Sequence, residues 1–69
     1  GTIKSPLPGV ILKLHVKVGD TIQLSQELIT LEAMKMENSI QADKAGKIEA
    51  IHFSTGDAVM EGDVLMTIK

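Results

Sequence analysis

Apolar and polar residues alternate along part of the chain, and this alternation predicts a β-strand. Residues 10–18, "VILKLHVKV", alternate in this way and are rich in β-branched types, as a half-buried strand requires. A second strand is expected in "ELITLEAM" (27–34), and another in "DVLMTIK" (63–69). No stretch keeps a convincing helical period, so the sequence predicts an all-β fold.

The chain contains two copies of one unit. Residues 8–32 align without a gap on residues 45–69, with apolar positions kept in register. The identical pairs are Gly9/Gly46, Ile11/Ile48, His15/His52, Gly19/Gly56, Asp20/Asp57, Leu28/Leu65 and Thr30/Thr67. The Gly-Asp pairs are turn signals, because glycine takes positive φ without steric cost. We therefore expect two related halves, arranged about a pseudo-twofold axis and packed face to face.

The spacing of apolar residues also predicts an irregularity in each half. Ile11 and Leu14 are matched apolar positions three residues apart, and Ile48 and Ile51 repeat that spacing. Strict alternation would put the members of each pair on opposite faces of a strand. We therefore expect β-bulges near residues 12–13 and 49–50.

Length and composition narrow the functional classes. The 69 residues correspond to one small domain, 1–69. The absence of cysteine excludes disulfides, thiolate zinc sites and cysteine nucleophiles. The net charge is −2 without charge blocks, and Phe53 is the only aromatic residue. We expect no nucleic-acid binding, which would call for a basic face and stacking aromatics.

The ends of the chain and its hydropathy lead to expectations about its context. No apolar run has the length of a membrane span, and no charged-then-apolar leader precedes the domain. We expect no membrane insertion and a cytoplasmic location. Because the chain begins "GTIK" without an initiator methionine, we expect it to be a C-terminal fragment of a longer polypeptide.

The segment "EAMKMEN" (32–38) lies between the two copies and places Lys35 between Met34 and Met36. If the copies pair about a pseudo-twofold axis, this link is a hairpin at one pole of the domain. Lys35 would then occupy an exposed turn held by two strands. Such a turn is a suitable place to offer a nucleophilic amine to another protein.

"EAMKM" in this position resembles the attachment sequence of biotinyl carrier domains. The resemblance extends over the whole chain and includes "SPLPGVI", "VGDTI", "GKIEAI", "TGDAV" and "GDVLMTI". It implies a flattened barrel-sandwich hybrid of two four-stranded sheets, with Lys35 as the biotin acceptor. Glu32, Ala33, Met34 and Met36 then flank the acceptor, and the two methionines form a soft recognition surface.

The resemblance also implies partners and a mode of action. A biotin–protein ligase would join biotin to the Lys35 ε-amine through biotinyl-adenylate. The tethered ureido nitrogen would then carry carboxylate between a biotin carboxylase (or decarboxylase) and a carboxyltransferase subunit. The domain itself would catalyse no reaction, since the cofactor and its partners perform the chemistry.

The family contains several types of enzyme, and the pattern does not identify the acyl-CoA or keto acid. Carriers of bacterial acetyl-CoA carboxylases have an extra "thumb" in the first half, for which the ungapped repeat leaves no space. This difference favours a decarboxylase, a transcarboxylase or a propionyl-CoA carboxylase.

Other candidate sites have simpler interpretations. His15 and His52 have no further metal-ligand motif, so we expect solvated strand histidines. Asp20 and Asp57 adjoin turn glycines, which favours turn hydrogen bonding over acid–base chemistry.

Three alternative functions remain open. A lipoyl carrier shares the fold, and "DKA" at residues 43–45 resembles its attachment tripeptide. Lys44 aligns with Leu7, however, and not with the midpoint hairpin. An unmodified adaptor module is the second alternative, and an enzyme active in its own right is the third.

Overall fold

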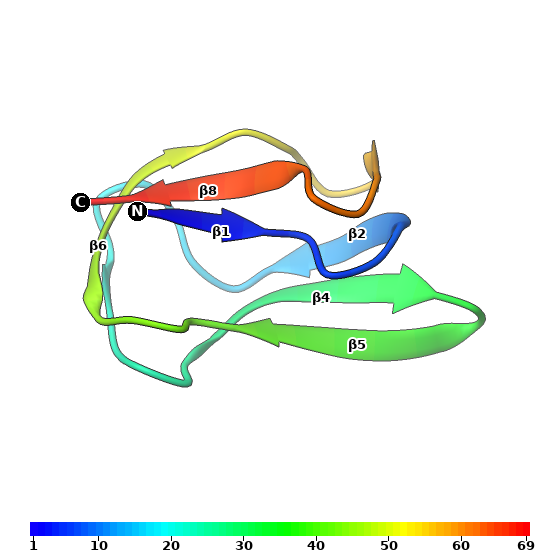
Figure 1. Cartoon of the computed structure of the whole chain (residues 1–69), viewed down its shortest axis with the longest axis horizontal. Helices are drawn as coiled ribbons and strands as arrows, with labels where there is room; N and C mark the ends of the chain where they lie inside the picture. The colour runs from blue at the N-terminus through cyan, green and yellow to red at the C-terminus, as the bar shows by residue number, and fades with distance from the viewer.

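Eight strands and no helix make up the computed structural model, which describes residues 1–69 (Figure 1). The strands are β1 (Thr2–Lys4), β2 (Gly9–Leu14), β3 (Thr21–Ile22), β4 (Glu27–Ala33), β5 (Met36–Gln41), β6 (Gly46–Ile51), β7 (Ala58–Val59) and β8 (Val64–Ile68). They form two four-stranded antiparallel sheets, in the orders β1-β8-β6-β3 and β5-β4-β2-β7. The expected sandwich of two four-stranded sheets is thus confirmed. There is no helix that could span a membrane.

The internal repeat is longer than the sequence alignment indicates. β2, β3 and β4 correspond to β6, β7 and β8, and each half contributes its short strand to the opposite sheet, since β3 pairs with β6 and β7 with β2. β1 also corresponds to β5, because each is the edge strand beside the last strand of a copy. This exchange of strands interlocks the two halves about the pseudo-twofold axis.

The two expected bulges are present. The register between β2 and β4 shifts between Ile11 and Lys13, and that between β6 and β8 shifts between Ile48 and Ala50. The extra residue lets two apolar residues three positions apart face the same side of a strand. Ile11 is fully buried and Leu14 packs against the same core.

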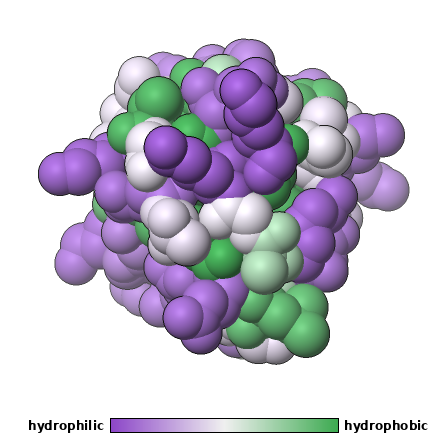
Figure 2. All heavy atoms as spheres, turned by 90° about the vertical axis from the view of Figure 1, so that its left-hand side faces the viewer, coloured by the Kyte–Doolittle hydropathy of each residue, from purple (hydrophilic) through white to green (hydrophobic).

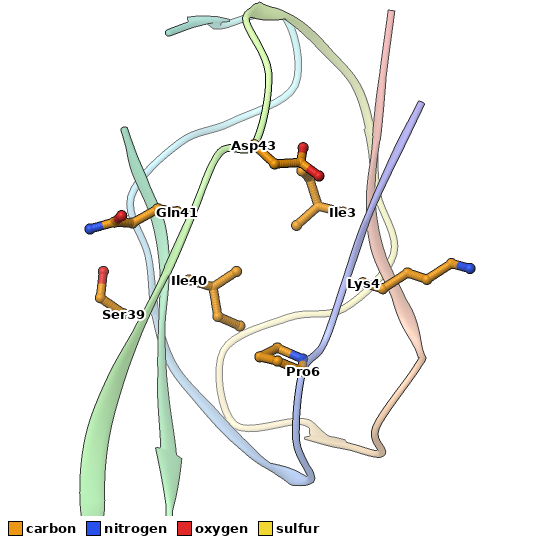
Figure 3. A pocket seen from close by; sticks show the side chains of 7 residues that line it. All are labelled: Ile3, Lys4, Pro6, Ser39, Ile40, Gln41 and Asp43. Carbon is orange, nitrogen blue, oxygen red and sulfur yellow. The ribbon is translucent and has the colours of Figure 1, made fainter. Parts of the chain in front are cut away.

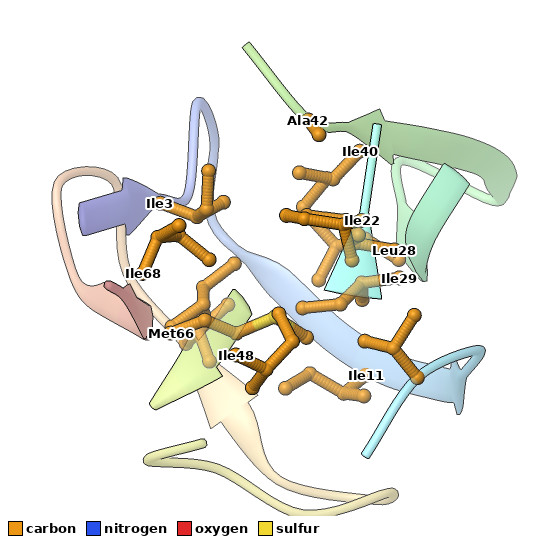
Figure 4. Close-up of a cluster of buried hydrophobic side chains, with 14 residues drawn as sticks. Ile3, Ile11, Ile22, Leu28, Ile29, Ile40, Ala42, Ile48, Met66 and Ile68 are labelled. Atoms are coloured by element: carbon orange, nitrogen blue, oxygen red, sulfur yellow. The ribbon is translucent and has the colours of Figure 1, made fainter. Parts of the chain in front are cut away.

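The core fills the space between the two sheets, where apolar side chains from both layers meet (Figure 4). Its largest fully buried members are Ile11, Ile22, Leu28, Ile29, Leu31, Ile48, Leu65, Met66 and Val59. Burying one such side chain stabilises the fold by roughly 1.5–3 kcal/mol. The framework behind the hairpin is therefore well packed.

The Gly-Asp turns have the geometry that the sequence predicts. Gly19 and Gly56 take φ of 96° and 93°. Asp20 accepts a hydrogen bond from the Lys17 amide at 2.9 Å, and Asp57 accepts one from the Ser54 amide at 2.8 Å. Both aspartates thus stabilise their turns, as expected.

Candidate functional site

The β4–β5 hairpin forms one pole of the molecule, with its turn at the right-hand end of Figure 1. Its strands pair from Glu27 and Gln41 to Ala33 and Met36, so only Met34 and Lys35 make the turn. Both residues have positive φ, 55° and 63°, which is the pattern of a type I′ turn. The midpoint hairpin expected from the repeat is therefore present, and its turn is as short as a hairpin commonly allows.

The turn is strained because neither of its residues is glycine or asparagine, the usual occupants of type I′ turns. Left-handed backbone costs an ordinary residue roughly 1–2 kcal/mol. The long pairing of β4 with β5, and of β4 with β2 on its other side, holds the turn in this conformation. Strain maintained by a rigid framework is typical of functional sites.

The side chains of the turn project into solvent. Met34 is 91% exposed and Met36 66% exposed, and Lys35 is exposed between them. The only ion pair in the structure joins His15 and Glu27, and no side-chain hydrogen bond involves the Lys35 ammonium. A primary amine without a partner, on a turn with a fixed backbone, fits covalent attachment of an acyl group.

Glu32 and Ala33 lead into the turn and have different environments. Ala33 is buried, and a side chain on Gly9 of the neighbouring strand would come within 3.3 Å of its Cβ and 2.5 Å of the Glu32 carbonyl oxygen. Gly9 therefore allows β2 to pack closely against the end of β4. This contact anchors the base of the hairpin to the sheet.

Glu37 is a feature of the site that the sequence analysis missed. It pairs directly with Glu32 across the hairpin, and both side chains are exposed without an ion-pair partner. Directly opposed side chains lie about 5 Å apart at Cβ, and like charges there are destabilising. The two-residue turn determines which residues face each other across the hairpin. Predicting the length of the turn from the sequence would therefore have revealed the Glu32–Glu37 pair.

The two histidines lie just after β2 and β6, so the expectation that they are strand residues is wrong. They are solvent-exposed, as expected, and follow directly on the last strand residues, Leu14 and Ile51. His15 Nε2 hydrogen-bonds to Thr30 Oγ1 at 2.7 Å, and His52 Nε2 to Thr67 Oγ1 at 2.9 Å. No group of three or more His, Asp or Glu residues is arranged to hold a metal ion.

Lys44, the lysine of "DKA", lies in the loop between β5 and β6 and is half-buried. This loop is at the end of the molecule opposite the hairpin, where both termini are found (Figure 1). That end presents mainly hydrophilic atoms, with apolar atoms in separate patches (Figure 2). Lys44 is therefore not on the turn of the midpoint hairpin, where Lys35 lies. This agrees with the alignment of Lys44 with Leu7.

A cavity of about 260 Å³ lies between the edge strands β1 and β5. It is lined by the repeat-equivalent pairs Ile3/Ile40, Lys4/Gln41 and Pro6/Asp43, together with Ser39, so it sits on the pseudo-twofold axis. Ile3, Ile40 and Pro6 point into the space between the strands, whereas the Lys4 ammonium points away (Figure 3). The cavity is thus a consequence of the symmetric packing of two sheet edges.

Comparisons with known proteins agree with this geometry. The family model described as "Biotin-requiring enzyme" matches residues 1–68. The chain is 55% identical to the biotin carboxyl carrier protein of Streptococcus mutans, over 97% of this chain and 52% of that protein. It is 46% identical to the mitochondrial propionyl-CoA carboxylase alpha chain of Mus musculus, over 99% of this chain and 9% of that protein.

A solved structure has the same fold. The urea carboxylase of Kluyveromyces lactis superposes with a TM-score of 0.93 at 33% identity, covering 100% of this chain and 6% of that protein. The chain therefore spans about half of the carrier protein and a small part of the two carboxylases. From its family match, its relatives and its fold, the chain belongs to the biotin/lipoyl attachment family and is a biotinyl domain similar to those of biotin-dependent carboxylases.

Proposed function

We propose that Lys35 carries biotin in amide linkage, and that the domain moves a carboxyl group between two active sites of a larger biotin-dependent enzyme. The observation that carries the proposal is the position of Lys35 at the tip of the hairpin, exposed and without a partner. When bound, biotin supplies the ureido nitrogen that accepts and releases the carboxyl group. The chain would be one domain of a longer, cytoplasmic polypeptide, or one subunit of an assembly.

Attachment needs a neutral amine and an activated acyl group. The Lys35 Nζ attacks the acyl carbon of biotinyl-adenylate, a C–N bond forms, the bond to the adenylate oxygen breaks, and AMP leaves. The Lys35 ammonium loses one proton before the attack and a second as the amide forms, and we assign both deprotonations to the ligase. The domain contributes an amine that projects from a short, fixed turn and is bordered by two apolar side chains.

Transfer requires that the cofactor reach two separate sites. A biotinyl-lysine side chain is long and flexible, and tethering replaces diffusion between sites by a high local concentration. The rigid core and the two-residue turn keep the base of this arm at a defined place. We therefore assign positioning to the domain, and the chemistry to biotin carboxylase (or decarboxylase) and carboxyltransferase partners.

The loops of the first half support a carrier without a thumb. Residues 15–20 between β2 and β3 match residues 52–57 between β6 and β7 in length, and so do residues 23–26 and 60–63 before β4 and β8. No extra segment rises beside the hairpin. We propose an enzyme of the propionyl-CoA carboxylase, decarboxylase or transcarboxylase type, whose acyl acceptor the domain itself does not select.

The test is biotinylation in vitro, with peptide mapping. Incubation with ATP, biotin and a biotin–protein ligase should add one biotin, on Lys35. Lys35→Arg should accept none, and the matched control Lys44→Arg should be labelled like the wild type. Labelling of the Lys35→Arg variant at Lys44 would refute the assignment, as would loading of the wild type by a lipoate–protein ligase but not by the biotin–protein ligase.

A further inference from the structure

The methionines of this domain are divided sharply by exposure. Met34, Met36 and Met60 are 91%, 66% and 65% exposed, whereas Met66 is completely buried. Methionine is an apolar residue that usually fills gaps in cores, and only Met66 does so here. Three thioether sulfurs are thus open to solvent, and two of them border the proposed acceptor lysine.

An exposed thioether is open to a chemical change that a buried one resists. The sulfur attacks a peroxide oxygen, the O–O bond breaks, an S–O bond forms, and water (or an alcohol) leaves. The sulfur loses two electrons to the peroxide, and the product is methionine sulfoxide. Thiol-dependent reductases reverse the reaction, so the change can be regulatory.

We propose that Met34 and Met36 form an oxidation site that reversibly switches off the acceptor hairpin. This inference rests on the proposed function, because the switch acts by preventing a partner protein from engaging Lys35. A sulfoxide is polar and chiral, and it must be stripped of water when a partner closes over the turn. Burying such a group without a hydrogen-bond donor is unfavourable.

The same change costs the free domain little. Met34 and Met36 lie at the end of the hairpin and make no part of the core, whereas Met66 is enclosed between the sheets. The paired strands and the buried residues stay as they are when the two exposed sulfurs gain oxygen. Oxidation at the turn therefore changes recognition and leaves the fold intact.

Met60 is a built-in control. Its exposure matches that of Met36, but it follows β7 at the opposite edge of the sheet from β5, with β4 and β2 between them. It should oxidise at a rate similar to Met36. Because it does not border the turn, its oxidation should not produce the switch.

The experiment treats the folded domain with hydrogen peroxide and follows each methionine by peptide mapping. Met34 and Met36 should be oxidised while Met66 is spared. The rate of biotinylation by a biotin–protein ligase should then fall by about tenfold. A methionine sulfoxide reductase should restore it, with no change in melting temperature.

Two variants separate the hairpin methionines from the others, and each is compared only with its own untreated form. Met34→Leu with Met36→Leu should have the same biotinylation rate before and after peroxide. Met60→Leu should lose biotinylation rate on treatment as the wild type does.

An unchanged wild-type rate after complete oxidation of Met34 and Met36 would overturn the switch, as would an equal loss in the double variant. Failure of the untreated wild type to accept biotin would instead refute the proposed function.

Discussion

Ser25 and Gly62 occupy the same turn in the two halves of the fold, with φ of 71° and 89°. Each precedes a residue that closes the turn with its side chain. Gln26 Oε1 accepts a hydrogen bond from the Gln23 amide at 2.9 Å, and the equivalent Asp63 accepts one from the Met60 amide at 2.8 Å. The second half thus has glycine at a left-handed position where the first half has serine.

Replacing Ser25 by glycine should stabilise the domain. The change removes roughly 1–2 kcal/mol of left-handed strain. It also adds conformational freedom to the unfolded chain, worth about 0.4–1 kcal/mol. We therefore expect a net gain of about 0.5 kcal/mol, seen as a higher urea midpoint at unchanged slope.

Ser54→Gly is the matched control for that prediction. Ser54 is also an exposed serine in a turn region, but it does not take positive φ. This variant should lose stability, because only the gain in unfolded-state freedom remains. A stabilised Ser54→Gly, or a destabilised Ser25→Gly, would contradict the strain argument.

Much of the fold follows from local patterns in the sequence. The apolar residues Ile11 and Leu14 are three positions apart, which requires a bulge if both face the core, and the bulge is present. Gly19 and Gly56 mark turns that only glycine occupies easily. In these places the residue type and the backbone conformation agree, so sequence reasoning succeeds.

The parts that the sequence did not predict are those where residue type and conformation disagree. Ser25 carries no sign of positive φ, so its turn was not anticipated. Met34 and Lys35 are not turn formers, so a hairpin was expected but not a two-residue type I′ turn. The equivalence of β1 with β5 was hidden because "TIK" and "SIQ" share only their isoleucine.

A turn sequence suited to type I′ geometry should stabilise the domain and abolish its function. Met34→Asn with Lys35→Gly removes two strained residues whose exposed side chains make no core contact. We expect a gain of about 1 kcal/mol, or roughly 4–8 °C in melting temperature for a domain of this size. The variant should accept no biotin.

Leu24→Gly tests whether that gain comes from backbone strain. Leu24 is 66% exposed in a turn but does not take positive φ. Glycine there should lower the melting temperature, because it only loosens the unfolded chain. If the hairpin variant melted below the wild type, the turn would not be strained.

Glu37→Gln should stabilise the hairpin by relieving repulsion from Glu32. The two carboxylates face each other across the strands, and opposed like charges cost a few tenths of a kcal/mol up to about 1 kcal/mol. The gain should shrink in high salt, which screens exposed charges. Denaturation midpoints at low and high salt measure both effects.

Glu61→Gln controls for the change in net charge. Glu61 is exposed in the turn after β7 and has no strand partner, so its neutralisation should leave stability almost unchanged. An equal gain in both variants would mean that overall charge, rather than the Glu32–Glu37 pair, sets the effect.

Biotinylation should leave the stability of the domain nearly unchanged. The acceptor side chain leaves from the tip of the hairpin, between two methionines that point into solvent, so its modification disturbs neither strand pairing nor core. Loss of one exposed, unpaired charge matters by less than about 1 kcal/mol. The unmodified and biotinylated forms should therefore melt within roughly 4–8 °C of each other in the same buffer. A larger rise would mean that biotin packs against the domain, and the cavity between β1 and β5 would be the first place to look for it. If Ser39→Glu, at an exposed position in the wall of that cavity, then abolished the rise, the biotin arm would be docked there rather than moving freely.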